Sequence, residues 1–211
     1  MRHAASKELF GYWDRLRNGR SAPRRDEVEP SDIRYLLSDT FILEVSPQLK
    51  TVSYRLAGTR TCTIFGRELK GYGFLGHWSE NDSFDVSRLL AQVYRDLKPL
   101  MIVARGFTES GRNADFEMVL LPLEPMADGS ARILGALTAS RDHYWLGSEP
   151  IGDLKLRAAN CPFDRTASMK YDPFAAAPLA PALEQEPETG MVDLTAVKRV
   201  AHLTVHNGGK A

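Results

Sequence analysis

The sequence lacks a net charge, because 27 Lys and Arg residues are balanced by 27 Asp and Glu residues. Proteins that bind nucleic acid or anionic membranes need a clustered basic surface, since release of counterions from the polyanion drives that binding. The densest basic run, residues 15–25, is interleaved with polar residues and is typical of a solvated face. We therefore expect no nucleic-acid partner.

Long apolar runs and clustered metal ligands are also missing. No stretch approaches the roughly 20 apolar residues of a membrane-spanning helix, and residues 1–14 lack the apolar segment of a secretory signal. Cys62 and Cys161 are too few and too far apart for a disulfide framework or a metal site. The five histidines show no metal-binding spacing either. We expect a cytoplasmic protein without membrane insertion and without a metal.

What the sequence does contain is a regular succession of helical and strand patterns. Apolar residues at helical spacing, such as Leu9, Trp13 and Leu16, predict a helix near the N-terminus, with Ser6 as its N-cap. Thr59 is expected to cap another helix. The predicted helices are 7–16, 31–37, 60–65 and 83–97. Alternating or continuous apolar runs predict strands at 41–45, 52–57, 100–107, 116–123 and 131–140.

This order predicts an α+β fold, a five-stranded antiparallel sheet with helices on one face. Glycines in the turns at 109–113 and 127–130 favour hairpins between the last three strands. We place an N-terminal helix and connector at 1–30, the domain at 31–150 and a C-terminal tail at 151–211. Residues 172–190 are rich in Pro, Ala and Glu, which predicts disorder. Residues 191–207 regain an alternation that fits either a strand or a docking peptide.

Four segments carry a resemblance to a known family: FGYWDRLRNGRSAPRRDEVEPSDI (10–33), YRLAGTRTCTIFGRELKGYGFLGHW (54–78), FEMVLLPLE (116–124) and ILGALTA followed by WLG (133–147). In this order they resemble the alphaproteobacterial PAS-like family of short single-domain proteins, over roughly residues 6–150. The resemblance implies a PAS fold and a non-enzymatic bacterial regulator in signal transduction, acting through protein–protein contacts. It names no ligand or cofactor, because PAS-like folds host many functions.

The sequence does not match three other kinds of site: a phosphate-binding loop, a flavin photoreceptor site and a haem site. The segment around Gly58 has one glycine and no GK[ST], so it is not a phosphate loop. A flavin photoreceptor of the PAS class carries a cysteine in a GRNC-type motif; GRNADF (111–116) has Ala114 there, and the position after the third predicted helix is Leu69 or Phe74. Haem would need a histidine on the helix 83–97, which has none. His77, just before it, is expected to be a surface or capping residue.

An apolar pocket between the helices and the sheet is the remaining candidate site. The residues expected to line it, or simply to fill the core, are Tyr54, Cys62, Phe65, Phe74, Trp78, Leu90, Tyr94, Met118 and Leu120. Cys62 has an alternative role, because a thiol-based enzyme or redox sensor could use it with His77 or Arg60 as activator. Without such chemistry, the chain would pass a signal by binding a separate signalling protein.

The predicted N-terminal helix has two possible uses. The runs 100–104 and 118–123 are apolar on both faces, so the second face of the sheet also needs a cover. Leu9, Trp13 and Leu16 could pack on that face, on residues such as Leu121 and Leu134. Alternatively, they could pair with a second subunit, which predicts a homodimer.

Overall fold

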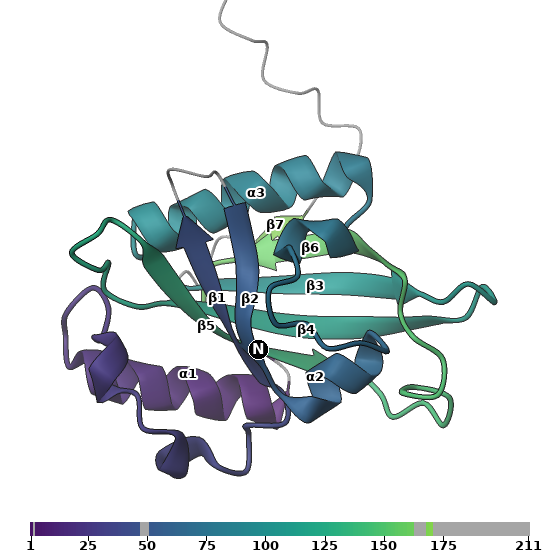
Figure 1. Ribbon diagram of the computed structural model, residues 1–211, viewed down its shortest axis with the longest axis horizontal. Helices are drawn as coiled ribbons and strands as arrows, with labels where there is room; N and C mark the ends of the chain where they lie inside the picture. The colour runs from purple at the N-terminus through teal and green to yellow at the C-terminus, as the bar shows by residue number, and fades with distance from the viewer. Residues whose placement is uncertain (2, 47–50, 163–167, 171–211) are drawn as a thin grey trace, which may run out of the picture. The chain divides into compact units, whose positions relative to one another are not determined.

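The computed structural model describes residues 1, 3–46, 51–162 and 168–170, which are built on one antiparallel sheet (Figure 1). Its order is β2-β1-β5-β4-β3-β6-β7, so that β4 and β5 lie in the interior of the sheet. The strands are β1 (Thr40–Ser46), β2 (Thr51–Ala57), β3 (Leu100–Phe107), β4 (Asn113–Pro122), β5 (Ala131–Ala139), β6 (Asp153–Asn160) and β7 (Ser168–Lys170).

Three α-helices and three short 3-10 helices accompany the sheet. They are α1 (Ala4–Arg17), η1 (Arg25–Glu27), η2 (Pro30–Ile33), α2 (Thr59–Ile64), η3 (Phe74–His77) and α3 (Glu80–Arg95). Among the described residues, no helix combines the length and the apolarity needed to cross a bilayer. The predicted caps were wrong for the first two α-helices: His3 caps α1, Ser6 is buried within it, and Gly58 caps α2. Ser79 caps α3 by accepting a hydrogen bond from the Asp82 backbone N–H.

The two predicted hairpins are confirmed. Gly111 and Gly129 lie in the turns between β3 and β4 and between β4 and β5, with φ of +85° and +78°. Side chains with a Cβ rarely adopt this left-handed conformation, whereas glycine does so without a steric cost. These turns set the register of β3, β4 and β5, which form the antiparallel meander that the sequence predicted.

The sheet is longer than expected, with seven strands instead of five. β6 lies beyond residue 150, in the part that the sequence analysis assigned to the tail, and it pairs with β3. An irregularity at Val103–Ala104 interrupts this pairing, and close to it the Leu156 N–H donates to Oδ2 of buried Asp82, at 3.2 Å. The segments 172–190 and 191–207, for which disorder and a docking peptide were considered, lie outside the described residues.

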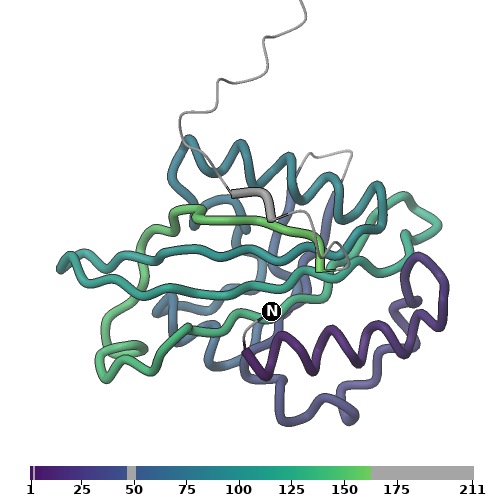
Figure 2. Tube along the Cα trace, turned by 180° about the vertical axis from the view of Figure 1, so that it is seen from behind, coloured from purple at the N-terminus to yellow at the C-terminus, as the bar shows by residue number. Residues whose placement is uncertain are grey.

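Helices cover both faces of the sheet, and the cover of the second face includes the N-terminal helix that was considered for it. The first face carries α2, η3 and α3 and an apolar cluster that we call the inner cluster; it includes Phe41, Tyr54, Phe74, Trp78, Leu90, Phe116, Met118 and Leu120. The second face carries α1 and the outer cluster, which includes Leu9, Tyr12, Trp13, Ile33, Val119, Leu121 and Leu134. Figure 2 shows from behind how α1 runs along the sheet.

Two uses were considered for the N-terminal helix, and in the structure it packs on the second face of the sheet. Leu9 and Trp13 are fully buried against β4 and β5, and Leu16 is partly buried beside them. The Trp13 indole Nε1–H donates to the Pro122 carbonyl oxygen at 2.7 Å, which fixes the helix on the strand. Leu9 and Trp13 are therefore not available to a second subunit.

This contact gives a stability prediction. Trp13→Phe keeps most of the buried ring but leaves the Pro122 carbonyl without its donor, which should lower the free energy of unfolding by about 1–3 kcal/mol. Trp13→Ala also creates a cavity and should cost about 3–5 kcal/mol. Urea unfolding measures both. Tyr144→Phe, at a side chain 89% exposed, is the control; a Trp13→Ala variant as stable as this control would contradict the role of Trp13.

Candidate ligand site in the inner cluster

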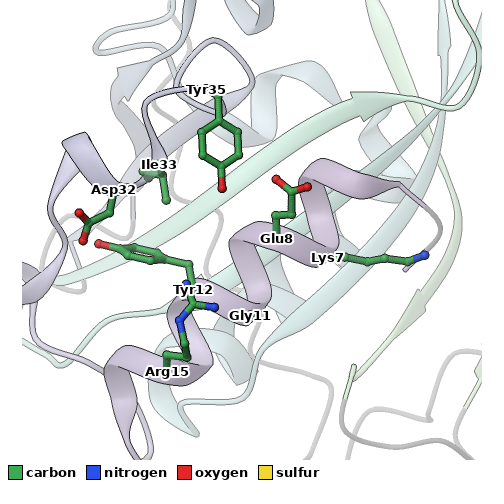
Figure 3. A pocket seen from close by; sticks show the side chains of 8 residues that line it. All are labelled: Lys7, Glu8, Gly11, Tyr12, Arg15, Asp32, Ile33 and Tyr35. Carbon is green, nitrogen blue, oxygen red and sulfur yellow. The ribbon is translucent and has the colours of Figure 1, made fainter.

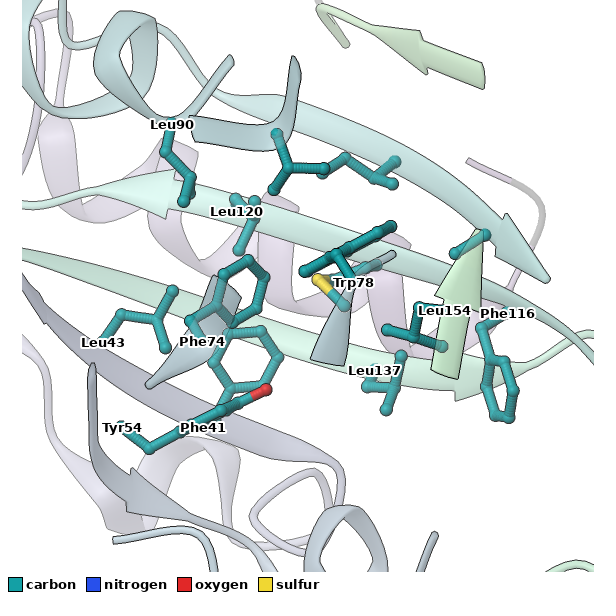
Figure 4. Close-up of a cluster of buried hydrophobic side chains, with 14 of the residues drawn as sticks. Phe41, Leu43, Tyr54, Phe74, Trp78, Leu90, Phe116, Leu120, Leu137 and Leu154 are labelled. Carbon is teal, nitrogen blue, oxygen red and sulfur yellow. The ribbon is translucent and has the colours of Figure 1, made fainter. Parts of the chain in front are cut away.

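The residues predicted to line a pocket come from β2, α2, η3, α3 and β4, and the structure brings them together in the inner cluster (Figure 4). Cys62 and Tyr94 are partly buried at its margin. Buried within it are Tyr54, Phe65, Phe74, Trp78, Leu90, Met118 and Leu120. Most of these residues could be predicted because they lie on the apolar side of a strand or helix, whereas Phe65 and Trp78 directly follow α2 and η3.

Tyr54 is the centre of an aromatic group inside this cluster. Its ring meets Phe41 edge-on, with centroids 5.6 Å apart and planes at 71°, and it lies 5.7 Å from Phe74. Edge-to-face pairs of this kind are favoured by the quadrupoles of the rings. Complete burial raises the pKa of the Tyr54 phenol far above its ordinary value, so the hydroxyl stays protonated.

His77 is buried in the same group, so the expectation of a surface or capping residue was wrong. Its imidazole stacks on Phe65 at 3.9 Å and lies 4.8 Å from the Tyr72 ring. Burial, with a smaller contribution from the Arg67 charge, lowers the pKa of His77 to about 4. The ring is therefore neutral near pH 7. The aromatic residues around it in the segment 72–78 were the available sequence signal.

Several buried polar atoms of this helical layer have no hydrogen-bond partner among the described residues. They are His77 Nε2, Trp78 Nε1 and Thr61 Oγ1, which belong to η3, the residue after it, and α2. A buried polar atom without a partner costs about 1–3 kcal/mol, and such atoms are usually satisfied by ordered water or a ligand. The layer thus contains an indole donor, a hydroxyl and a neutral imidazole that are buried without a partner among the described residues.

Two surface pockets of the described residues lie outside the predicted set of pocket residues. One of about 250 Å³ borders α1, and one of about 230 Å³ lies at the edge formed by β1 and β2. Neither is lined by any of the predicted pocket residues.

Cys62 lies beside the cluster without either of its proposed activators as a hydrogen-bond partner. Its Sγ is 3.9 Å from the Ala57 carbonyl oxygen and 3.9 Å from Glu68 Oε1, and both are acceptors. Arg60 instead pairs with the buried carboxylate of Asp39, at 2.7 Å between Nη1 and Oδ1. The burial of Asp39 was not predicted, because a charged residue next to a strand gives no sign of its burial in the sequence. Within the described part of the chain, no group of side chains is arranged to hold a metal ion.

The positions considered for flavin photochemistry carry no thiol. Leu69 and Phe74 are fully buried apolar side chains of the inner cluster. Ala114 stands near the start of β4, after the turn at Gly111, which is the place that the hairpin prediction gave to this motif.

A family model agrees with this architecture. A family model described as PAS domain matches residues 1–138. No curated protein matches the chain. Among solved structures, a point variant of RsLOV is similar with 15% identity and a TM-score of 0.39, over 54% of this chain and 69% of that one. The RsLOV d2 variant is similar with 16% identity and a TM-score of 0.39, over 55% and 69% of the two chains.

The buried imidazole predicts a pH dependence of stability. Between about pH 4 and pH 6.5, the unfolded chain binds a proton at His77 that the folded chain does not. The free energy of unfolding should therefore fall as the pH drops through this window, by roughly 3 kcal/mol in all. His77→Phe should flatten the dependence in urea unfolding measured from pH 4 to 7. His143→Phe, outside the cluster, should retain it; equal slopes in the two variants would refute the assignment.

Proposed function

The chain belongs to the PAS domain family, and on this premise we propose that it is a non-enzymatic cytoplasmic sensory module that binds a small molecule in the inner cluster. The unpartnered polar atoms of the helical layer carry the proposal. In a core that binds no ligand, apolar groups at these positions would give a higher free energy of unfolding, because each unpartnered polar atom is destabilising. A ligand with hydrogen-bonding groups would remove that cost.

The chemistry of these atoms restricts the ligand. Trp78 Nε1 is a donor only, so it requires an acceptor, whereas the Thr61 hydroxyl and the neutral His77 imidazole each pair with a donor or an acceptor. The surrounding rings of Tyr54, Phe65 and Phe74 favour a flat apolar body. We therefore expect an uncharged, largely apolar molecule with at least one acceptor oxygen or nitrogen.

The output of the module is a contact with a separate signalling protein. A ligand shifts a conformational equilibrium only through different affinities for the two states. β4 and β5 contribute side chains to both the inner and the outer cluster, for instance Met118 and Val119 of β4. A change of packing in the inner cluster can therefore shift these strands and, through them, α1. The homodimer stays a prediction, and its surface cannot be made of Leu9 and Trp13.

The alternative of a thiol-based enzyme or redox sensor rests on the sequence alone. Arg60 is engaged by Asp39 and the His77 ring is stacked on Phe65. Neither arrangement favours activation of Cys62.

Native mass spectrometry of freshly purified protein, combined with an absorbance spectrum, tests the ligand. We expect a bound mass that is lost or much reduced in Trp78→Phe, because this variant removes the indole donor while keeping an aromatic ring. Trp145→Phe is the matched control, since Trp145 is also buried in the inner cluster and its indole nitrogen is not among the unpartnered atoms. The proposal would be contradicted if the wild-type protein carried no bound mass and if no compound in a ligand screen changed its stability.

A further inference from the structure

A pocket of about 250 Å³ lies on the other side of the sheet, between α1 and the segment around η2 (Figure 3). Its lining residues Tyr12 and Ile33 belong to the outer cluster, so it is separate from the inner cluster. The full lining is Lys7, Glu8, Gly11, Tyr12, Arg15, Asp32, Ile33 and Tyr35.

Gly11 lies in the middle of α1, where glycine is a poor helix former. Neither packing nor backbone conformation requires it there. A Cβ at this position would meet only the Arg15 guanidinium, at 3.9 Å, and its φ is not in the left-handed region. The effect of the glycine is to leave the surface of the helix bare, and this bare surface forms part of the pocket lining.

The wall beside this glycine is held in place. The Tyr12 hydroxyl accepts a hydrogen bond from the Glu29 N–H at 2.9 Å and donates to the Glu29 carbonyl oxygen at 3.3 Å. The ring is buried and cannot swing out without losing both bonds. Ile33 is buried next to it, whereas Tyr35 is 65% exposed and stands at the mouth of the pocket.

Charged groups of both signs surround the opening without pairing. Within the described part of the chain, neither Lys7 nor Arg15 forms a salt bridge with Glu8 or Asp32 or with any other carboxylate. Figure 3 shows the Asp32 carboxylate beside the Tyr12 hydroxyl, the Glu8 carboxylate directed toward Tyr35, and the Arg15 guanidinium close to Gly11; Lys7 points away. The pocket lining therefore includes one guanidinium and two carboxylates, with the Asp32 and Glu8 carboxylates at opposite ends of the pocket.

We propose that this pocket binds a small zwitterion of the size of a free amino acid. Asp32 receives the ammonium group, while the planar Arg15 guanidinium forms two parallel hydrogen bonds with the carboxylate of the ligand. The side chain of the ligand lies over the bare surface at Gly11 and against Ile33. The volume is below the 300–1,000 Å³ of pockets for drug-sized ligands, which fits a molecule of this size.

The first test is binding of free amino acids to the full chain. The twenty common L-amino acids, each up to 10 mM, are titrated with protein NMR shifts as the readout, and we expect at least one to bind and to move the resonances of Gly11 and Ile33. Its decarboxylated amine and its deaminated acid should each bind at least tenfold more weakly. Equal binding by the amine would overturn the role of Arg15, and binding by none of the twenty would overturn the site.

Variants separate binding from folding. Gly11→Leu should fill the pocket and abolish binding, whereas Gly11→Ala should raise the melting temperature, because alanine is the better helix former. Arg15→Gln and Asp32→Asn should each weaken binding at least tenfold with unchanged melting temperature. Arg25→Gln, in the other surface pocket, is the control and should bind normally.

The test of amino-acid binding at α1 does not depend on whether the inner cluster binds a ligand. Trp78→Phe changes the inner cluster alone and should leave amino-acid binding at α1 as in the wild type. Unaltered affinity in both Arg15→Gln and Asp32→Asn would show that the charged groups do not recognise the ligand, and this would overturn the proposal even if the inner cluster binds its own molecule.

Discussion

The structure depends on one constraint, that the central strands are apolar on both faces. Along β4, every residue from Phe116 to Pro122 is buried, and Glu117 is the single charged member of this run. A half-exposed antiparallel strand alternates between apolar and polar residues, whereas this one must be covered twice. The helices α2 and α3 with η3 supply the first cover, and α1 supplies the second. The N-terminal helix is therefore a required part of the domain, although it lies outside the region 31–150 that the sequence defined as the domain.

The parts of the fold that local chemistry determines could be predicted from the sequence. The strand at 100–107 has the predicted bounds, and the hairpin turns carry their glycines in the left-handed conformation. β6 was not predicted, although it carries a short alternation typical of a strand. Its buried Leu154 and Leu156 alternate with charged residues in a short run, and what makes it a strand is the free edge of β3, which is a property of the assembled sheet. The three-residue β7 continues that edge and is shorter still.

In the candidate site, too, some residues could be predicted from local patterns and others depend on tertiary contacts. The aromatic residues of the inner cluster could be selected, because apolar side chains at regular spacing are buried whatever the details of packing. The burial of His77 depends on the 3-10 turn at Phe74–His77, which places the imidazole on Phe65, and no periodicity reports such a stacking. Asp39 and Asp82 are missed for a similar reason. Each carboxylate accepts a hydrogen bond from a nearby serine, and a second partner that lies far away in the sequence, Arg60 or the Leu156 N–H, completes its pairing.

The double coverage also limits how this protein can signal. Burying a side chain as large as Leu9 or Trp13 stabilises by roughly 1.5–3 kcal/mol each, so detaching α1 would cost more than the few kcal/mol that separate the states of a switch. A shift of α1 along the sheet, with its apolar side still covered, costs far less. A partner would then contact the exposed side of the helix, which carries Lys7, Glu8 and Arg15.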